Sequence, residues 1–336
     1  MTGETRTMVA MCGDSGTGKS TLTSGIVKLL GERRVTTVCT DDYHALDRRQ
    51  RRACGITALD PRANNLAMLA EHVRRLQAGQ AVAKPVYDHT DGTIKGPETV
   101  APREFVLVQG LHPLFTPDLR ACFDLKVYLD PHPALKRAWK IKRDVAKRGY
   151  TPEQVEAEIA ARQPDAEAHI FPQKPHADVI VTFHPPHDPF DAVHDNAYLN
   201  ARVLTRSHLP PLDMSALGAT AGARRDFWQH DGQLEDGTPV SVLEIRGDME
   251  RPRALELEEM IWGLIGRGQA LGVDTLGQFA DGLAPAKSES LGLVQLVLLW
   301  HVLAGRAATA AQGDGAGRTG ARVRGPGRVP AAAAQS

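Results

Sequence analysis

The chain has 336 residues, enough for one large domain or two modest ones, and its 42% hydrophobic and 24% charged residues are typical of a globular protein. Lys and Arg together number 40, and so do Asp and Glu. The chain therefore has no net charge that would draw it to nucleic acid or to a membrane, and any basic site must be local.

The spacing of the cysteines and the lengths of the apolar runs indicate the cellular compartment of the protein. The four cysteines lie far apart, at Cys12, Cys39, Cys54 and Cys122. This is neither a disulfide framework nor a zinc-ribbon spacing. Residues 1–7 contain no apolar segment of a secretory signal, and the longest apolar run, residues 291–304, contains Gln295 and His301 and is too short to cross a bilayer. We therefore expect a soluble, cytoplasmic protein with reduced thiols.

Residues 13–21 read Gly-Asp-Ser-Gly-Thr-Gly-Lys-Ser-Thr, which fits the phosphate-binding pattern G-x-x-x-x-G-K-[ST] without a mismatch. Residues 8–12 predict a short buried strand, and residues 22–30 predict a helix that ends at Gly31. This strand–loop–helix context distinguishes a phosphate-binding loop (P-loop) from an ordinary glycine-rich turn. Its glycines let N–H groups point at an anion, and the helix N-terminus adds partial positive charge.

The P-loop predicts a site for ATP. Lys19 would reach the β- and γ-phosphates, and Ser20 would offer its hydroxyl to Mg²⁺. The residues expected to bind the nucleotide are Gly13, Asp14, Ser15, Gly16, Thr17, Gly18, Lys19, Ser20 and Thr21. A nucleotide site alone does not identify a reaction, so other residues must do so.

Strand and helix patterns alternate through the first half of the chain. Further strands are expected at residues 35–39, 105–109, 125–129 and 178–183. Helices are expected from Asp60-Pro61 to just before Gly79, at 133–147 and at 152–162, and residues 84–95 read as a polar loop with a turn at Asp91-Gly92. The alternation predicts an α/β fold of the P-loop NTPase type, in which helices cover both faces of a doubly wound, mainly parallel sheet.

The pattern changes after about residue 184, where a loop rich in Pro and His begins. Strands are expected at 201–204 and 240–245, and helices at 254–264 and 288–303, without a catalytic signature. From residue 306 the chain is rich in Gly, Ala, Arg and Pro and cannot bury enough apolar surface to fold. We therefore divide the chain into a P-loop core (1–185), a smaller C-terminal α+β portion (186–305) and a disordered tail (306–336).

Two aspartates, Asp41 and Asp42, follow the second predicted strand, at the sheet edge where α/β folds place ligands. Both are candidates for a catalytic base, because phosphoryl transfer to a hydroxyl needs a carboxylate that orients the hydroxyl and accepts its proton. The alternative is that they cap a helix or stabilise a turn. The sequence does not decide between these interpretations.

A helix over residues 136–148 would place five charged residues on one face: Lys140, Arg143, Asp144, Lys147 and Arg148. A solvated helix face usually mixes the two signs of charge, whereas this one holds a single acid. The excess of positive charge favours a site for two phosphates, one from the nucleotide and one from a phosphorylated substrate. A solvated surface face remains the alternative.

A second basic cluster follows Asp41 in the sequence, at Arg48, Arg49, Arg51 and Arg52. Guanidinium groups are suited to the phosphate of a sugar phosphate. Nucleic acid is the other interpretation, but the cluster lacks the interleaved aromatic residues of single-strand binders.

His44 and His89 lie in polar loops and are expected to contact phosphate or hydroxyl groups, whereas His184 and His187 lack a third partner for a metal site.

Besides the P-loop, several motifs stand out: residues 40–48 (TDDYHALDR), 60–65 (DPRANN), 84–89 (KPVYDH), 110–115 (GLHPLF), 140–144 (KIKRD), 148–150 (RGY) and 240–244 (VSVLE). With these motifs the chain resembles the phosphoribulokinase/uridine kinase family of P-loop kinases, and within it the longer, plant and cyanobacterial type of phosphoribulokinase. The first and fifth motifs are far more specific than the P-loop, which many NTPases share.

The resemblance implies ATP-dependent phosphorylation of D-ribulose 5-phosphate at its C1 hydroxyl, a step of the Calvin cycle. It implies that Asp41 is the catalytic base and that Lys19 and Asp144 take part in catalysis. Residues expected to hold the sugar phosphate are His44, Arg48, Tyr87, His89, Lys140, Arg143 and Arg148. Ser20 and Gln109 are expected at Mg²⁺. The partner is then a small sugar phosphate rather than nucleic acid or a membrane, and a homo-oligomer, a dimer or larger, is expected.

Two positions depart from the family pattern. Gln109 stands where the family has a glutamate suited to Mg²⁺ or its water shell, so an oxygen is kept but its charge is lost. Thr17 stands where redox-regulated members have a cysteine that pairs with the position of Cys39, so that disulfide cannot form and dithiol reductants should leave activity unchanged. Two alternatives stay open: a related P-loop kinase of another sugar phosphate or a nucleoside, and a catalytically impaired nucleotide-binding regulator.

Overall fold

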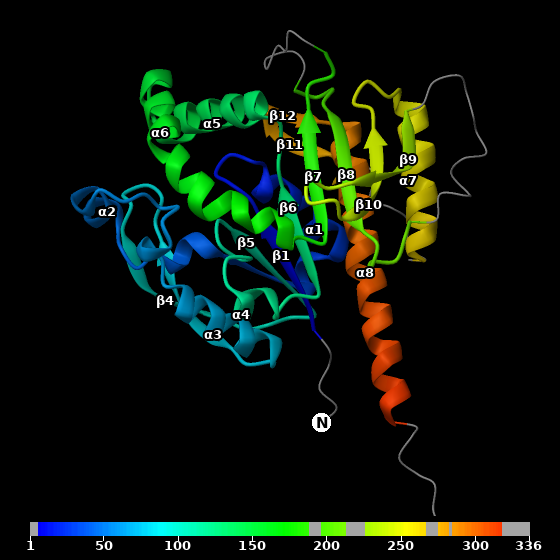
Figure 1. Cartoon of the computed structure of the whole chain (residues 1–336), viewed down its shortest axis with the longest axis horizontal. Coiled ribbons are helices and arrows are strands. Elements are labelled where there is room, and N and C mark those ends of the chain that lie inside the picture. Colours follow the sequence, from blue (N-terminus) through cyan, green and yellow to red (C-terminus); the bar gives the residue numbers. More distant parts are fainter. Residues whose placement is uncertain (1–5, 188–195, 213–225, 267–274, 282–283, 318–336) are drawn as a thin grey trace, which may run out of the picture.

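The computed structural model describes residues 6–187, 196–212, 226–266, 275–281 and 284–317 (Figure 1). These residues form one eight-stranded sheet and two separate two-stranded sheets. Helices lie on both sides of the large sheet, as the alternation of strand and helix patterns predicts.

The first half of the chain supplies the parallel strands, which are β1 (Thr7–Cys12), β2 (Val35–Cys39), β5 (Phe105–Gly110), β6 (Leu125–Leu129) and β7 (Val179–His184). They lie side by side in the order β2, β5, β1, β6, β7 and all run in the same direction. This confirms the mainly parallel sheet. It also places β1, and the P-loop at its carboxyl end, in the middle of the parallel part.

Neighbouring side chains of β1 enter two different cores, because this central strand is buried on both faces. Val9 packs in the core that contains α1 (Lys19–Leu30), and Met8 packs in the core that contains α3 (Leu66–Gln77). The strand therefore reads as a continuous apolar run rather than as an alternating one. The P-loop that follows it is anchored from both sides of the sheet.

The same sheet continues after β7 with three antiparallel strands, β8 (Asn200–Arg206), β10 (Pro239–Ile245) and β9 (Phe227–Gln233). β8 and β10 confirm the two strands predicted for this half. β9 was not predicted, because none of its side chains is buried and it carries no apolar alternation. The strands on the two sides of residue 185 therefore share one hydrogen-bonded sheet.

Helices α7 (Arg251–Ile265) and α8 (Glu289–Gly317) pack on the same side of the sheet as α1 and confirm the two helices predicted for the second half (Figure 1). Residues 306–317, predicted to begin a disordered tail, are helical, because an alanine-rich segment continues the buried part of α8. Residues 318–336 lie outside the described part. Among the described residues, none of the helices is long and apolar enough to cross a membrane.

Residues 84–95, predicted to be a polar loop, belong mostly to a hairpin of β3 (Val82–Tyr87) and β4 (Ile94–Val100). The predicted turn at Asp91-Gly92 joins the two strands, and Gly92 there has a φ of 79°. The strands escaped prediction because no side chain of β4 is buried, so the sequence carries no apolar alternation.

Helix α3 begins at Leu66 and is capped by the Asn65 side chain, which accepts from the Met68 N–H. The predicted start at Asp60 was wrong, because Asp60 caps a short 3₁₀ turn over Pro61–Ala63 instead. An Asp that precedes Pro can cap the start of an α-helix or of a 3₁₀ turn, so the sequence does not distinguish the two.

The remaining elements surround the carboxyl edge of the sheet. Helices α5 (Pro133–Arg148) and α6 (Pro152–Asp165) confirm their predicted positions. The short helices α2 (Arg48–Cys54) and α4 (Pro117–Arg120) and the strands β11 (Gln278–Asp281) and β12 (Ala284–Lys287) were not predicted. These elements are too short for a helical or alternating pattern to appear.

The contact between α1 and α8 is so close that it requires a glycine. A Cβ on Gly25 would lie 2.1 Å from Nε2 of Gln295. Gln295 is fully buried, and its Oε1 accepts from the Gly277 N–H at 3.0 Å, so the amide has little room to move. Gly25→Ala should lower the free energy of unfolding by about 1–3 kcal/mol, the usual cost of overpacking. Chemical denaturation measures it.

Gly263→Ala in α7 is the matched control, because nothing among the described residues lies within 4 Å of the added Cβ. Alanine should raise stability there by about 0.5–1 kcal/mol, since glycine is a poor helix former. Equal stabilisation by the two substitutions would contradict the close contact between α1 and α8.

Candidate active site

A cavity of about 780 Å³ lies at the carboxyl ends of β1, β2 and β5. Its lining includes most of the P-loop, Cys39 and Asp41 beyond β2, and Gln109 at the end of β5. Side chains of α2, β3, α5 and α6 line it as well, and residues of β7, β11 and α8 and of the segment before β8 complete it. The fold thus brings the P-loop, the aspartate and both basic clusters to one space, at the sheet edge where open α/β sheets bind ligands.

The P-loop lies against α5 at a distance that requires glycine. Gly16 has a φ of 86°, and a Cβ on it would lie 3.0 Å from Cβ of Lys140. Gly18 has a φ of 88° and forms the N-cap of α1, whose first N–H groups have no intrahelical partner. Residues 15–21 line the cavity, whereas Gly13 and Asp14 do not. The local geometry is that of an anion-binding loop.

Lys19 lines the cavity, and its Nζ donates to the carbonyl oxygens of Gly13 at 2.9 Å and Asp14 at 2.7 Å. Burial lowers the pKa of Lys19, and the carboxylates of Asp41 and Asp14 oppose this shift. The ammonium therefore lies within electrostatic reach of Asp41. This places a cation and a candidate base in one site.

The structure assigns different positions to the two aspartates after β2. Asp42 is fully engaged: its carboxylate accepts from Lys84 Nζ at 2.8 Å and from the Tyr87 N–H at 2.9 Å, which attaches β3 to the end of β2. Asp41 lines the cavity, with Nε2 of His89 at 3.7 Å. Burial acts to raise the pKa of Asp41, but His44, His89 and Lys19 together hold it below its usual value. Asp41 is therefore the aspartate available to a ligand.

Tyr87 lies between two histidines and beside an arginine. Its ring meets those of His44 and His89 edge to face, with centroids 4.6 and 4.9 Å apart. Its hydroxyl accepts from Arg51 at 2.8 Å. Burial lowers the pKa of both histidines, so each is neutral at pH 7 and can accept or donate a hydrogen bond at the cavity. All four side chains line the cavity.

Helix α2 presents arginines to the cavity. Arg48, Arg51 and Arg52 line it, and Arg49 does not. Arg48 donates to the carbonyl oxygen of His89 at 2.6 Å, so it connects α2 to the hairpin turn. Arg51 is almost fully buried. The second basic cluster therefore faces the same space as the P-loop.

The cations on the basic face of α5 pair with one buried carboxylate. Asp144 has no exposed surface and pairs with Lys140 at 3.0 Å, Arg143 at 2.8 Å and Arg148 at 3.3 Å. Burial acts to raise the pKa of Asp144, but the hydrogen bonds and charges of Arg143 and Lys140 lower it to about 2. One carboxylate thus holds cations on successive turns of the helix.

Two residues of this face do not reach the cavity. Arg143, Lys147 and Arg148 line it, whereas Lys140 and Asp144 are buried and do not. Lys140 also pairs with Glu158 of α6 at 3.2 Å. Of the residues predicted for catalysis and sugar-phosphate binding, Lys140 and Asp144 are therefore placed to position their neighbours rather than to contact a ligand directly.

Some residues that line the cavity were not predicted from the sequence. Glu158 and Arg162 of α6 line the cavity and pair with each other at 2.6 Å. Their only signal is an i,i+4 pair of opposite charge, which also describes many surface helices. Cys39 lines the cavity too, and burial raises its pKa to about 12, so its thiol stays protonated at neutral pH. Thr17, which stands where redox-regulated members of the family are expected to have a cysteine, donates to the Asp14 carbonyl oxygen at 2.9 Å.

The residues expected at Mg²⁺ fit a hard cation. Ser20 and Gln109 both line the cavity, as Asp41 does. The Gln109 Oε1 atom is buried and has no hydrogen-bond partner among the described residues. Hydroxyl, amide and carboxylate oxygens are the ligands that Mg²⁺ prefers. The site therefore offers oxygen ligands but only one carboxylate among these three residues.

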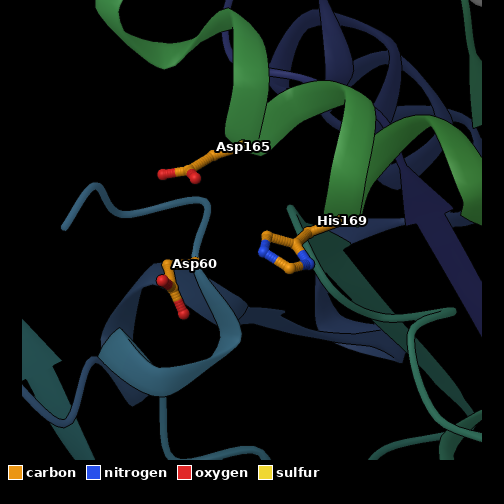
Figure 2. A group of neighbouring side chains, drawn as sticks. All are labelled: Asp60, Asp165 and His169. Atoms are coloured by element: carbon orange, nitrogen blue, oxygen red, sulfur yellow. The ribbon is translucent and has the colours of Figure 1, made fainter.

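Beside the cavity, Asp60, Asp165 and His169 bring their polar atoms within 4.8 Å of one another (Figure 2). Both carboxylate oxygens of Asp60 accept from the guanidinium of Arg62, and Asp165 accepts from the Thr57 hydroxyl at 2.6 Å. Figure 2 shows Asp165 and His169 on the helical segment and Asp60 on the facing loop. This cluster connects the segment after α2 to α6, and both of its carboxylates already have partners.

Comparisons with known proteins identify the family of the chain. The sequence model of the family described as "Phosphoribulokinase / Uridine kinase family" matches residues 8–188. The chain is 47% identical over 174 residues to a phosphoribulokinase of Synechocystis, a match that covers 52% of each protein. It is 33% identical over 291 residues to the chloroplastic phosphoribulokinase of Chlamydomonas reinhardtii, covering 76% of this chain and 74% of that one. In the first match the chain spans about half the length of its relative.

A solved structure shares the fold. Phosphoribulokinase from Rhodobacter spheroides superposes with a TM-score of 0.56 at 18% identity, covering 79% of this chain and 98% of that chain. At this identity the similarity supports the architecture of the sheet and its helices and says nothing about individual side chains.

The ion cluster around Asp144 should make stability depend on pH. The pKa of Asp144 is about 2 in the folded protein, against an ordinary value of 3.8. The carboxylate therefore contributes about 2 kcal/mol above pH 3.8, and this contribution is lost as the pH falls toward 2. Asp144→Asn should lower the free energy of unfolding by at least that amount at pH 7, and the difference from the unsubstituted protein should shrink below pH 4.

Chemical denaturation at pH 7, 4 and 3 measures this difference. Glu156→Gln is the control, because Glu156 pairs with the exposed Arg137 at the surface and such pairs contribute little. An equal loss of stability in both variants, or a loss from Asp144→Asn that does not change with pH, would contradict the assigned role of Asp144.

Proposed function

Because the family match covers more than half of its residues, the chain belongs to the phosphoribulokinase/uridine kinase family, and we propose that it transfers the γ-phosphoryl group of ATP to the C1 hydroxyl of D-ribulose 5-phosphate. The observation that carries the proposal is the joint cavity. The P-loop, Asp41 and the arginines of α2 and α5 all line one space. Such a cavity suits an acceptor that already carries a phosphate.

The distribution of charge favours a sugar phosphate over a nucleoside. Nine Lys and Arg side chains line the cavity, against three carboxylates. Arginines beyond those near the P-loop would have no anionic partner if the acceptor were uncharged uridine. The neutral His44 and His89 and the hydroxyl of Tyr87 would face the hydroxyl groups of the sugar. The relatives named phosphoribulokinase support the same acceptor.

Each reacting group has a candidate residue. Asp41 would orient the C1 hydroxyl and accept its proton, and its lowered pKa keeps it ionised at neutral pH. Lys19 and Arg143 would neutralise charge on the transferred phosphoryl group. Mg²⁺, held beside Ser20 and Gln109, would supply further neutralisation of the phosphates when bound. A cytoplasmic location and a homo-oligomeric state belong to the same proposal.

Gln109 favours one competing function, a nucleotide-binding regulator with impaired catalysis. It replaces a family glutamate at the site expected for Mg²⁺, and its Oε1 has no partner among the described residues. The presence of Lys19 and Asp41 in the cavity lining argues for an active kinase instead.

An acceptor assay tests the proposal directly. ADP release is measured with ribulose 5-phosphate, ribose 5-phosphate and uridine as separate acceptors at fixed ATP and Mg²⁺. We expect turnover with ribulose 5-phosphate, because only a phosphorylated acceptor uses the cavity arginines. Turnover with uridine alone would overturn the choice of acceptor. ATP binding without ADP release, unrestored by Gln109→Glu, would favour the regulator.

Substitution of Asp41, the proposed catalytic base, separates an effect on phosphoryl transfer from an effect on ATP binding. Asp41→Asn should lower kcat about 10²- to 10⁴-fold, since the hydroxyl loses its proton acceptor, while the affinity for ATP changes by less than about threefold. Asp42→Asn is the matched control, because Asp42 holds β3 and should affect stability more than kcat. A near-normal rate in Asp41→Asn, measured by the same ADP assay, would assign the base to another residue.

A further inference from the structure

One acid of the P-loop has no part in the phosphate chemistry proposed above. Asp14 is the single Asp or Glu in residues 13–21, and it does not line the cavity. Its carboxylate accepts from the Ser15 N–H at 2.6 Å and from Nζ of Lys136, in the first turn of α5, at 3.0 Å. The side chain of Asp14 is 15% exposed and that of Lys136 is 20% exposed. This largely buried ion pair joins the P-loop to the start of α5.

The ion pair is the first of three contacts between the loop and one stripe of α5. Residues 136, 140 and 143 are spaced four and three apart, so they lie on one face of the helix. A Cβ on Gly16 would lie 3.0 Å from Cβ of Lys140 and 3.4 Å from the carbonyl oxygen of Lys136. Arg143 donates to the Ser15 hydroxyl at 3.3 Å. The loop thus meets three successive turns of α5, and Arg143 lines the cavity at the far end of the stripe.

Lys136 is also held from a second side. Its Nζ lies over the ring of Phe171, 5.3 Å from the centroid, where an ammonium is attracted by the face of the ring. Burial acts to raise the pKa of Asp14, but the charge and hydrogen bond of Lys136 hold it below its usual value, so the carboxylate is ionised at neutral pH. An ammonium between an ionised carboxylate and an aromatic ring has a fixed position. It can therefore serve as a fixed point of attachment for α5.

Electrostatics explain why the loop has an acid at this place. Lys19 and the free N–H groups at the start of α1 make the loop positive, and the stripe of α5 that faces it carries three cations. Bound phosphates would attract both surfaces. Before a nucleotide binds, Asp14 is the residue of the loop that supplies negative charge between them. An attachment that exists before binding leaves the cations of α5 preorganised for the phosphates.

We propose that Asp14 and Lys136 are positioning residues for phosphoryl transfer: their ion pair sets where α5 lies on the P-loop and thereby holds Arg143 beside the transferred phosphoryl group. Neither residue of the pair contacts a ligand, since both lie outside the cavity lining. The inference rests on the proposed function and extends it, because Arg143 is the cation of α5 assigned there to the transferred group. It also gives Asp14, which the sequence pattern places among the nucleotide-binding residues, a different task.

The main test removes the charges of the pair and keeps the shapes of its side chains. Asp14→Asn retains an oxygen for the Ser15 N–H, and Lys136→Met retains the aliphatic stem. Each should lower kcat with ribulose 5-phosphate about 10- to 100-fold, the cost of a small misplacement of a catalytic group, as measured by ADP release. The double variant should be no slower than the slower single variant, because both substitutions remove one interaction. Lys136→Arg keeps the charge and should stay within about threefold of the unsubstituted protein.

A second comparison asks whether the pair acts through Arg143. In an Arg143→Ala background, Asp14→Asn should change kcat by less than about twofold, because the group that the pair positions is already gone. A general loosening of the loop would instead multiply the two losses. Lys174→Met is the matched control, because Lys174 pairs with Asp130 just before α5, at 2.6 Å, and lies outside the lining of this cavity. It should leave kcat unchanged.

Nucleotide binding gives a readout that needs no turnover. Calorimetry on the full-length protein without acceptor measures the affinities for ATP and ADP, which differ by the γ-phosphate. Asp14→Asn and Lys136→Met should each reduce the preference for ATP over ADP about 3- to 10-fold, the usual net contribution of one hydrogen bond, and leave ADP within about twofold. Equal losses for ATP and ADP in both variants, or a full loss of kcat from Asp14→Asn in the Arg143→Ala background, would overturn the proposal.

The outcomes also separate this inference from the proposed function. If no acceptor is phosphorylated but both variants lose the preference for ATP over ADP, the positioning role stands and the kinase proposal fails. If both variants phosphorylate ribulose 5-phosphate at the normal rate, the kinase proposal stands and the positioning role fails.

Discussion

The active-site cavity depends most on the ion pairs that the buried carboxylate of Asp144 makes with the cations of α5. A carboxylate without exposed surface is costly unless it is paired, and here it has Lys140, Arg143 and Arg148 around it. The same helix face lies against the P-loop, where Gly16 leaves just enough room for Lys140. Without the carboxylate these cations would repel one another, and the face of α5 beside the loop would lose its arrangement. The acid therefore positions both the loop and the arginines that line the cavity.

The sheet explains how residues far apart in sequence reach one cavity. β1 is buried on both faces and carries the P-loop in the middle of the parallel strands. β8, β10 and β9 continue that sheet, and α8 packs beside α1 at Gly25. The second half of the chain is consequently fixed relative to the P-loop by a shared sheet and a close helix contact. This rigidity is what allows residues as distant as Asn196 and Asp281 to hold Trp139.

Much of the site could be predicted from the sequence, because its signals are local. The P-loop has a fixed pattern, and Asp41 follows a buried strand at the sheet edge that binds ligands. Helical spacing also placed Arg143 and Arg148 on one face correctly. Spacing could not show that Lys140 and Asp144 lie beneath the cavity, because periodicity gives the direction of a side chain and not what covers it. Both are buried, and Lys140 pairs with Glu158 of α6.

The parts that could not be predicted have no periodic signal. β4 and β9 have no buried side chain, so no apolar alternation marks them. The apolar end of the cavity is built from single residues on α5, β7, β11 and α8 and on the segment before β8, namely Trp139, Phe183, Phe279, Leu291 and Leu199. Each of these reads as an ordinary core residue when it is considered alone. Only the fold shows that they surround one space, which is why nothing in the sequence of the second half indicated a function.

Because Gln109 is neutral, it does not offset the excess of positive charge in the cavity lining. Of the three carboxylates in the lining, Glu158 pairs with Arg162 and Asp281 pairs with Lys142. Among the described residues this leaves Asp41 as the lining carboxylate not bound to a Lys or Arg, and Gln109 adds no negative charge to the lining. A cavity with so large an excess of positive charge attracts phosphates but not a free divalent cation. With ATP as the substrate, as proposed, Mg²⁺ would depend mainly on the nucleotide phosphates, and Ser20 and Gln109 would offer it neutral oxygens.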